Sequence, residues 1–310
     1  MTIHVALLTE TDLGEADRIF RLAFGTFLGL PDPMRFAQGA DMVRTRFRAN
    51  PRAALGAFDG STLIGSNFAA KWGSFGFFGP LTIRPDYWNK GAAKQLLGAT
   101  LSLFKQWDIE QAGLFTFPQS PKHVGLYQKF GFWPQQLTAV MSCPVANAGG
   151  EVRLLSKLDG EARKVALNSI RTLSDAVFAG LDLSSEITAL ENQSLGEVIL
   201  IGEPDASAFA ICHLGSNTEA GPAGAFVKFA AVHPDSNPAQ GLKRLLSACA
   251  SLAARRGLEQ IIASVNTARH DAYRILIGAG YRTMMHGVAM QSPNAPGFNR
   301  PDAFVLDDWR

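Results

Sequence analysis

The sequence predicts a mixed α/β protein made of two similar units in tandem. The chain has 310 residues, which suggests about two domains. Apolar runs of strand length alternate with amphipathic stretches of helical period, a pattern typical of sheets flanked by helices. Landmarks of the first half also recur 149 positions later: Pro85 as Pro234, Leu96-Leu97 as Leu245-Leu246, and Gly131-Phe132 as Gly280-Tyr281. A constant offset with no insertion predicts an internal duplication.

The elements of the first unit follow from periodicity and from turn residues. We expect, in order, a strand at 3–8, a helix from about Thr11 that ends before Pro31, a helix at 36–47, strands at 53–58 and 63–72 joined by an Asp59-Gly60 turn, a strand at 74–83, a helix from about Lys90, a strand at 114–117, a helix at 122–129 and a strand at 132–142.

Two further features concern the organisation of the chain. The small-residue connector at 144–150 is the expected boundary between a first domain at 1–145 and a second at 151–310. On the helix expected at 36–47, Arg44, Arg46 and Arg48 are interpreted as a solvated face rather than a ligand clamp.

Composition excludes several classes of function. The net charge is +2 and no run of basic residues is long enough to bind nucleic acid or an anionic membrane. The three cysteines are scattered, and the histidines lack the spacing of a zinc site, so no metal is expected. The N-terminus lacks a signal-peptide pattern and no stretch is long enough to span a membrane. We therefore expect a cytoplasmic protein.

The chemistry is expected in the stretch Leu81–Leu97. It reads as a buried strand, a proline that stops it, a loop of small residues and then an amphipathic helix. The first N–H groups of a helix have no partner within it, and the helix dipole places partial positive charge there. Such a start suits a phosphate, and the small residues Gly91, Ala92 and Ala93 would let a pyrophosphate approach the backbone closely.

This stretch resembles motif A of the GNAT acyltransferases, with Trp88, Gly91 and Ala93 at the pattern positions and Trp88 where Gln or Arg is usual. Downstream, HVGLYQKFGF resembles motif B of the same family through Tyr127, Gly131 and Phe132. The resemblance implies two tandem GNAT folds, each a mixed, mostly antiparallel sheet flanked by helices. It also implies acetyl-CoA (coenzyme A) as the cofactor.

The resemblance assigns site residues as well. It implies cofactor binding by Leu81, Thr82, Ile83, Asn89, Lys90, Gly91, Ala92, Ala93, Lys94 and Ser120. Polarisation of the acyl carbonyl is implied for a backbone N–H within 81–83. Protonation of the leaving sulfur is implied for Tyr127, whose hydroxyl stays protonated at neutral pH. The alternative for Tyr127 is a ring that merely packs in the core.

The general base is not identified by the sequence. The strand at 74–83 contains no carboxylate, and His123, one helical turn before Tyr127, reads more readily as a solvent-facing or helix-starting histidine. A water chain is a further alternative. In the second unit Leu276 replaces Tyr127, and Gln240, Gly241 and Leu242 replace the small-residue cradle. That unit is expected to be a degenerate copy, unless Tyr273 takes the role of the tyrosine.

The function predicted is acetyl-CoA-dependent N-acetylation of a primary amine, on a small molecule or a peptide. The alternative is a non-catalytic acyl-CoA-binding or regulatory protein, and a third hypothesis is aminoacyl transfer by a tandem relative. We expect no nucleic-acid or membrane partner, and a monomer or a homodimer. The acceptor itself is not determined by the sequence.

Overall fold

The computed structural model describes residues 2–145, 151–234 and 237–310. Its first half contains, in order, β1 (Ile3–Leu7), α1 (Leu13–Phe27), α2 (Val43–Ala49), β2 (Ala54–Asp59), β3 (Thr62–Trp72), β4 (Phe75–Phe78), β5 (Thr82–Ile83), α3 (Ala92–Gln106), β6 (Gln111–Thr116), α4 (Pro121–Gln128) and β7 (Trp133–Pro144). The second half contains β8 (Arg153–Leu154), α5 (Gly160–Val177), α6 (Ser184–Asn192), β9 (Gly196–Ile201), β10 (Ala208–Leu214), β11 (Gly224–Val232), α7 (Pro238–Arg255), β12 (Gln260–Asn266), α8 (His270–Gly278), β13 (Arg282–Ser292) and β14 (Val305–Leu306). Short 3₁₀ turns lie at Glu10–Asp12, Pro33–Arg35, Pro51–Ala53, Pro85–Tyr87 and Leu155–Lys157.

The duplication predicted from the sequence is visible in the elements. Moved by 149 positions, β4 and β5 fall on β11, β6 falls on β12, α4 on α8, and β7 on β13. The mixed α/β architecture with two GNAT-like units is therefore confirmed. The elements upstream of β11 follow a different spacing, because six residues separate β9 from β10 whereas two separate β2 from β3.

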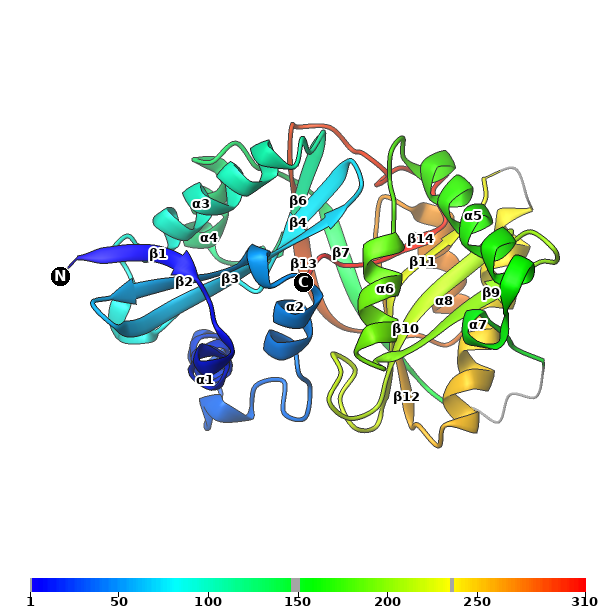
Figure 1. Ribbon diagram of the computed structural model, residues 1–310, viewed down its shortest axis with the longest axis horizontal. Coiled ribbons are helices and arrows are strands. Elements are labelled where there is room, and N and C mark those ends of the chain that lie inside the picture. The colour runs from blue at the N-terminus through cyan, green and yellow to red at the C-terminus, as the bar shows by residue number, and fades with distance from the viewer. Residues whose placement is uncertain (1, 146–150, 235–236) are drawn as a thin grey trace.

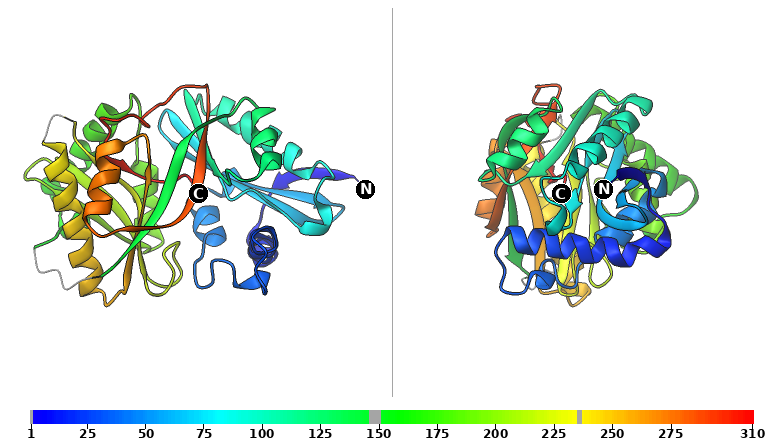
Figure 2. Two further views of the ribbon diagram at one scale, coloured as in Figure 1. Left: turned by 180° about the vertical axis from the view of Figure 1, so that it is seen from behind. Right: turned by 90° about the vertical axis from the view of Figure 1, so that its left-hand side faces the viewer.

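The two units exchange strands at their junction. The strands follow the order β1-β2-β3-β4-β6-β13-β7-β12-β11-β10-β9-β8 across the molecule. β13, from the second half, pairs antiparallel with β6, and β7, from the first half, pairs antiparallel with β12. β7 and β13 also pair with each other and run side by side through the middle of the molecule (Figures 1 and 2). Each unit is thus completed by a strand of the other.

Helices cover both faces of the sheet. In the first half, α3 and α4 lie on one face and α1 and α2 on the other (Figure 1). Alternation along β2 explains this, because Leu55 and Ala57 pack in one apolar cluster with α3 while Ala54 packs in another with α1. In the second half α7 and α8 pack on one face, and α5 and α6 on the opposite one.

The helix expected at 36–47 is wrong in its position, since α2 begins at Val43. Ala37 and Gly39 have φ angles of +49° and +85°, which an α-helix does not allow. The carboxylate of Asp41 then accepts a hydrogen bond from the Arg44 N–H at 3.1 Å and starts the helix. Residues 36–42 instead form a loop over the end of α1.

The prediction that the arginines of this helix form a solvated face is wrong for Arg46. The side chains of Arg44 and Arg48 are 45% and 55% exposed, as predicted. The side chain of Arg46 is only 10% exposed and forms an ion pair at 3.0 Å with Glu219 of the second half. Its partner lies 173 positions away, so helical periodicity could not reveal it.

Two expectations concern the ends of the units. Residues 146–150 of the predicted connector lie outside the described residues, so the boundary stays a prediction. Within the described chain, no helix is both long and apolar enough to cross a membrane.

Candidate functional site

The site predicted from motif A lies where two neighbouring strands separate. β4 and β6 are parallel and paired only over Phe75–Phe77 and Gln111–Gly113. The strand expected at 74–83 is interrupted at Gly79-Pro80, and its continuation, β5, remains paired with β3. On its other edge, β6 pairs with β13 over Ala112–Thr116. A wedge-shaped gap therefore opens between β5 and the end of β6.

Backbone donors line one side of this gap. The Arg84 N–H donates to the Ile64 carbonyl at 2.8 Å, and Thr82 pairs with Ser66, so these groups face β3. Because successive N–H groups of a strand point to opposite edges, those of Leu81 and Ile83 point into the gap. They are suited to hydrogen-bond a carbonyl oxygen placed there.

The start of α3 has the form of a phosphate cradle. Gly91 is the N-cap residue with φ +89°, and a side chain at this position would meet nothing within 4 Å. Its carbonyl accepts from the N–H groups of Lys94 and Gln95, which leaves the Ala92 and Ala93 N–H groups at the open helix end. The cradle therefore has space, donors and a helix dipole for a pyrophosphate.

Trp88, which stands where the family usually has Gln or Arg, shapes the loop before the cradle. Its indole N–H donates to the Ile83 carbonyl at 2.7 Å. The Lys122 ammonium lies 5.5 Å from its ring centre. Trp88 thus fixes the loop to β5 and brings a cation from α4 close to motif A.

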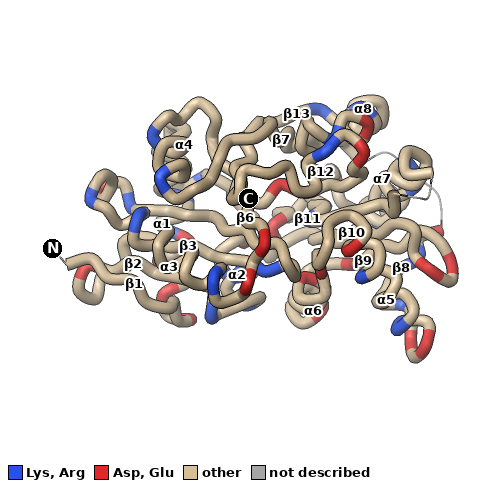
Figure 3. Tube along the Cα trace, turned by 90° about the horizontal axis from the view of Figure 1, so that it is seen from above, with Lys and Arg blue, Asp and Glu red and all other residues tan. Residues whose placement is uncertain are grey.

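One cavity of about 910 Å³ joins these features. It is lined by all the predicted cofactor residues but one, namely Leu81, Thr82, Ile83, Asn89, Lys90, Gly91, Ala92, Ala93 and Lys94, and by Tyr127. The exception is Ser120, which is buried, caps α4 by accepting from the His123 N–H at 3.4 Å, and is not among the lining residues. Lys122 and Lys129 also line the cavity, and Figure 3 shows basic positions on α4.

Two titratable groups of α4 face the same cavity. Burial raises the pKa of Tyr127 to about 12, against a side-chain hydrogen bond with Thr116 that lowers it. The hydroxyl is therefore protonated at any ordinary pH. Burial, and next the charge of Lys122, lower the pKa of His123. The imidazole is therefore neutral at pH 7 and able to accept a proton.

The corresponding gap in the second unit is filled by the chain itself. β11 and β12 pair only over Gly224–Phe226 and Gln260–Ile262, the same positions as in the first unit after the 149 offset. β14 then pairs with β11 at Ala230 and Ala231, which correspond to Leu81 and Thr82. On the other side, Ser264 of β12 donates to Asp308 at 2.7 Å. The C-terminal segment thus occupies the space where a cofactor would insert.

Buried charges hold this segment in place. Arg269 is fully buried, forms an ion pair with Asp307 at 2.7 Å and donates to the Val305 carbonyl at 2.8 Å. Trp309 is buried against Phe75 of the first unit, with ring centres 5.0 Å apart. Phe304, Leu306 and Trp309 are all buried and anchor the C-terminal segment.

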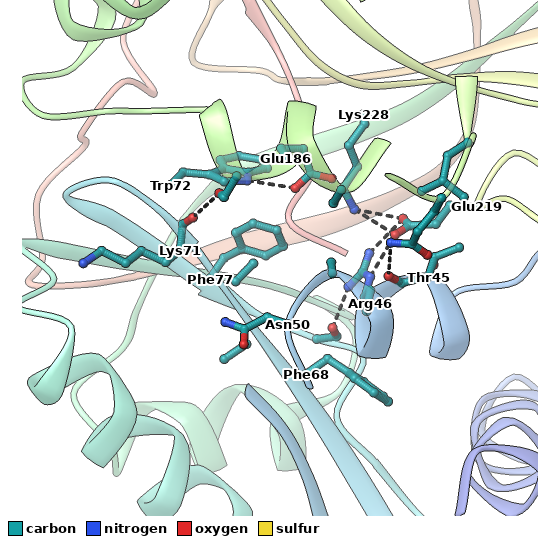
Figure 4. Close-up of a pocket in the computed structure, with 18 of the residues that line it drawn as sticks. Thr45, Arg46, Asn50, Phe68, Lys71, Trp72, Phe77, Glu186, Glu219 and Lys228 are labelled. Atoms are coloured by element: carbon teal, nitrogen blue, oxygen red, sulfur yellow. Dashed lines mark hydrogen bonds and ion pairs between the residues drawn. The ribbon is translucent and has the colours of Figure 1, made fainter. Parts of the chain in front are cut away.

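A second cavity, of about 400 Å³, lies between the two halves (Figure 4). Glu219 in its wall pairs with Arg46 at 3.0 Å and with Lys228 at 2.9 Å. Burial alone would raise the pKa of Glu219, but the charges of Arg46 and Lys228 outweigh it and hold that pKa well below its usual range. Trp72 donates to Glu186 in the same wall at 3.0 Å. The buried charges of Glu219, Arg46 and Lys228 at the junction of the two halves are thus paired with one another.

Several lining residues were missed from the sequence. Glu219 lines the main cavity as well, although it belongs to the second half. Phe24 of α1 and Phe117, which follows β6, line it too. An unusually high density of phenylalanine around α1 was the available signal, but periodicity does not distinguish a cavity wall from a core.

Comparisons with known proteins agree with this geometry. Residues 18–132 match the model of the acetyltransferase (GNAT) family. A candidate acetyltransferase from Pyrococcus horikoshii has a similar structure, with 15% identity, a TM-score of 0.70, and coverage of 99% of this chain and 95% of that one. A GCN5-related N-acetyltransferase from Sphaerobacter thermophilus has 12% identity and a TM-score of 0.60, with coverage of 95% and 96%.

A third similar structure, a GCN5-related N-acetyltransferase from Anabaena variabilis, has 14% identity, a TM-score of 0.52, and coverage of 94% of this chain and 72% of that one. No curated protein sequence matches the chain. At such identities the solved structures establish the fold, while the family model covers the segment that carries both motifs. Residues 18–132, within the first half of the chain, therefore match a GNAT acetyltransferase domain.

Proposed function

We propose that the protein is an acetyl-CoA-dependent N-acetyltransferase whose single active site lies in the first unit. The observation that carries this proposal is the cavity that joins the gap between β5 and β6, the start of α3 and the Tyr127 side chain. Its volume of about 910 Å³ lies in the range of small-molecule and cofactor sites. Acetyl-CoA bound there supplies an activated thioester carbonyl.

The residues of the chain then have distinct tasks. The Ala92 and Ala93 N–H groups and the lysines around them hold the pyrophosphate. The N–H groups of Leu81 and Ile83 bind the carbonyl oxygen as charge develops on it. The amine nitrogen forms a bond to the carbonyl carbon, the bond from that carbon to sulfur breaks, and Tyr127 gives its proton to the sulfur.

The attacking amine nitrogen must also lose a proton, and we assign its uptake to His123. The imidazole lines the cavity on the same helix as Tyr127, four positions earlier, and burial keeps it neutral. Glu219 also lines the cavity, but its carboxylate is held ionised by two cations and is a weak base.

A second candidate function is binding of acyl-CoA without turnover. It is favoured by the pairing of Glu219, the carboxylate in the cavity wall, with Arg46 and Lys228. Turnover of any amine by the purified protein removes this candidate.

The role of Tyr127 is tested by Tyr127→Phe. The ring remains, so the packing against Phe78 and the affinity for acetyl-CoA should change little, while kcat should fall by about 10²-fold or more, because a positioned general acid contributes that much. Steady-state kinetics and calorimetric titration measure the two effects. An unchanged kcat would exclude Tyr127 as the acid.

The role of His123 is tested by His123→Gln over a range of pH. The ratio of wild-type to variant activity should be constant at and above pH 6.5 and should decline toward one only at lower pH, because burial lowers the pKa of the imidazole below its ordinary value of about 6.5. A ratio that does not change between pH 5 and pH 8 would contradict this assignment.

A further inference from the structure

The part of the main cavity beside α1 has an aromatic lining. Five phenylalanines of the lining are in ring contact with one another, and we call them the aromatic wall: Phe20, Phe24, Phe27, Phe36 and Phe117. Neighbouring ring centres lie 4.9 to 5.9 Å apart. The ring of His123 continues this wall, 4.8 Å from Phe27, so the wall reaches the proposed proton acceptor.

The wall is held in place by polar contacts behind it. Arg21 of α1 pairs with Asp17 at 2.8 Å, and its guanidinium donates to the carbonyls of Phe36, Ala37 and Ala40 at 2.8 to 2.9 Å. These bonds fix the 36–42 loop, which carries Phe36, against the helix that carries Phe20, Phe24 and Phe27. The wall is therefore formed before a ligand arrives, which lowers the entropy lost on binding.

The wall retains apolar surface for a ligand to cover. Phe20 is buried, but Phe24, Phe27 and Phe36 are each partly exposed. Removing such surface from water favours an apolar partner, and flat rings prefer offset or edge contacts with other rings. A ring-sized group fits the spacing of these side chains.

The charges around the cavity disfavour a polycation. Among the described lining residues the only side-chain carboxylate is that of Glu219, which is already paired with Arg46 and Lys228. Four lysines of motif A and α4 line the same cavity: Lys90, Lys94, Lys122 and Lys129. A second or third ammonium on the acceptor would lose its water against apolar rings and would be repelled by these lysines. A single ammonium can be held over a ring face until it loses its proton.

We propose that the acceptor is a monoamine carried on a ring-sized apolar group, in the class of arylalkylamines, and not a polyamine or an aminoglycoside. This inference rests on the proposed function, because it assigns the acceptor of the same site. The wall contacts the ring of the acceptor, and the short alkyl linker places its nitrogen near His123 and the gap between β5 and β6.

The test measures binding of two amines, 2-phenylethylamine and spermidine, to the full-length protein loaded with coenzyme A, which cannot transfer an acyl group. We expect 2-phenylethylamine to bind at least about tenfold more tightly than spermidine, since it buries a ring against the wall. Equal or tighter binding of spermidine would overturn the proposal, and so would failure of 2-phenylethylamine to bind.

Variants link the preference to the wall. Phe24→Ala should weaken binding of 2-phenylethylamine by about fivefold or more, because ring contact is lost. The matched control is Leu28→Ala, which removes an apolar side chain that is 40% exposed and does not line the cavity; it should leave the affinity unchanged. Phe27→Glu adds an unpaired carboxylate and should raise the affinity for spermidine. If Phe24→Ala has no effect in a protein that still binds coenzyme A, the wall is not the acceptor site.

Two further arms separate this inference from its alternatives. If octanoyl-CoA binds more tightly than acetyl-CoA and displaces 2-phenylethylamine, the wall holds an acyl chain and the proposal fails. The amines are also titrated without coenzyme A. If coenzyme A does not bind but 2-phenylethylamine binds and requires Phe24, the acceptor class stands and acetyl transfer fails. If coenzyme A binds but 2-phenylethylamine does not, the proposed function stands and the acceptor class fails.

Discussion

Three titratable side chains of this protein derive their protonation state from burial more than from charged neighbours. Tyr127, His123 and His213 all lie in water-poor surroundings that disfavour their charged forms. For Tyr127 and His123 this keeps a proton donor and a proton acceptor neutral in one cavity. For His213, which lies in the wall of the second cavity, the consequence concerns stability.

His213 is 1% exposed, and neither ring nitrogen has a hydrogen-bond partner in the described structure. Burial lowers its pKa to about 4, with Lys228 and Arg46 acting in the same direction and Glu219 and Glu186 against it. Between pH 6.5 and pH 4 the unfolded chain binds a proton here that the folded chain does not. Stability linked to this group is therefore complete above pH 6.5 and is lost as the pH falls.

We predict that His213→Phe makes the protein less sensitive to acid. From pH 7.5 to pH 5.0 the wild type should lose about 2 kcal/mol through this residue, and the variant should lose that much less. Urea unfolding of both proteins at the two pH values measures the difference. An equal loss in both proteins would show that His213 is protonated in the folded state.

At the scale of elements, the site depends on how α3 begins. Gly91 adopts φ +89° at the N-cap, while Gly98 lies inside the same helix, and a side chain at either position would meet nothing within 4 Å. The two glycines therefore differ in backbone conformation and not in the space around them.

We predict opposite effects for the same substitution at these positions. Gly91→Ala should lower stability by about 1 kcal/mol, because an alanine in the left-handed region is strained, and should weaken binding of acetyl-CoA. Gly98→Ala should raise stability by up to about 1 kcal/mol and leave binding unchanged. Thermal unfolding and titration of both variants provide the comparison. A gain in stability at both positions would mean that the start of α3 can relax, and would contradict the cradle.

Much of the element scale could be predicted from the sequence, because it depends on local signals. Apolar periodicity located the strands and helices, and Gly91 and the small residues after it located the cradle. The position of α2 was not predicted, because the residues that shape the loop before it, Ala37 and Gly39, gave no recognised breaking signal. Motif spacing also identified Tyr127 as a lining residue, but the side chain of Ser120 caps α4 and does not line the cavity.

At the scale of the whole molecule, the decisive contacts join distant parts of the chain. The exchange of β7 and β13, the pairing of β14 with β11, and the ion pair between Arg46 and Glu219 each connect positions far apart in sequence. Periodicity within a short window contains no information on such pairs. The repeat predicted two units, but the exchange that completes them required the structure.

The whole-molecule architecture also makes the two units unequal. In the first unit the gap between the diverging strands is part of a large cavity, and in the second β14 occupies it, held by Arg269 and Asp307. Loss of the cradle residues, predicted from Gln240 and Leu242, is therefore accompanied by a physical block. We propose that only one of these two similar units binds acetyl-CoA.

Calorimetric titration of the full-length protein with acetyl-CoA tests this claim most directly, beside Gly91→Glu and the control Gly98→Glu. The control adds the same charge to the same helix at a position outside the cavity lining. We predict one molecule bound per chain, binding abolished by Gly91→Glu, and little change with Gly98→Glu. Two molecules per chain, or undiminished binding by the Gly91→Glu variant, would contradict the account.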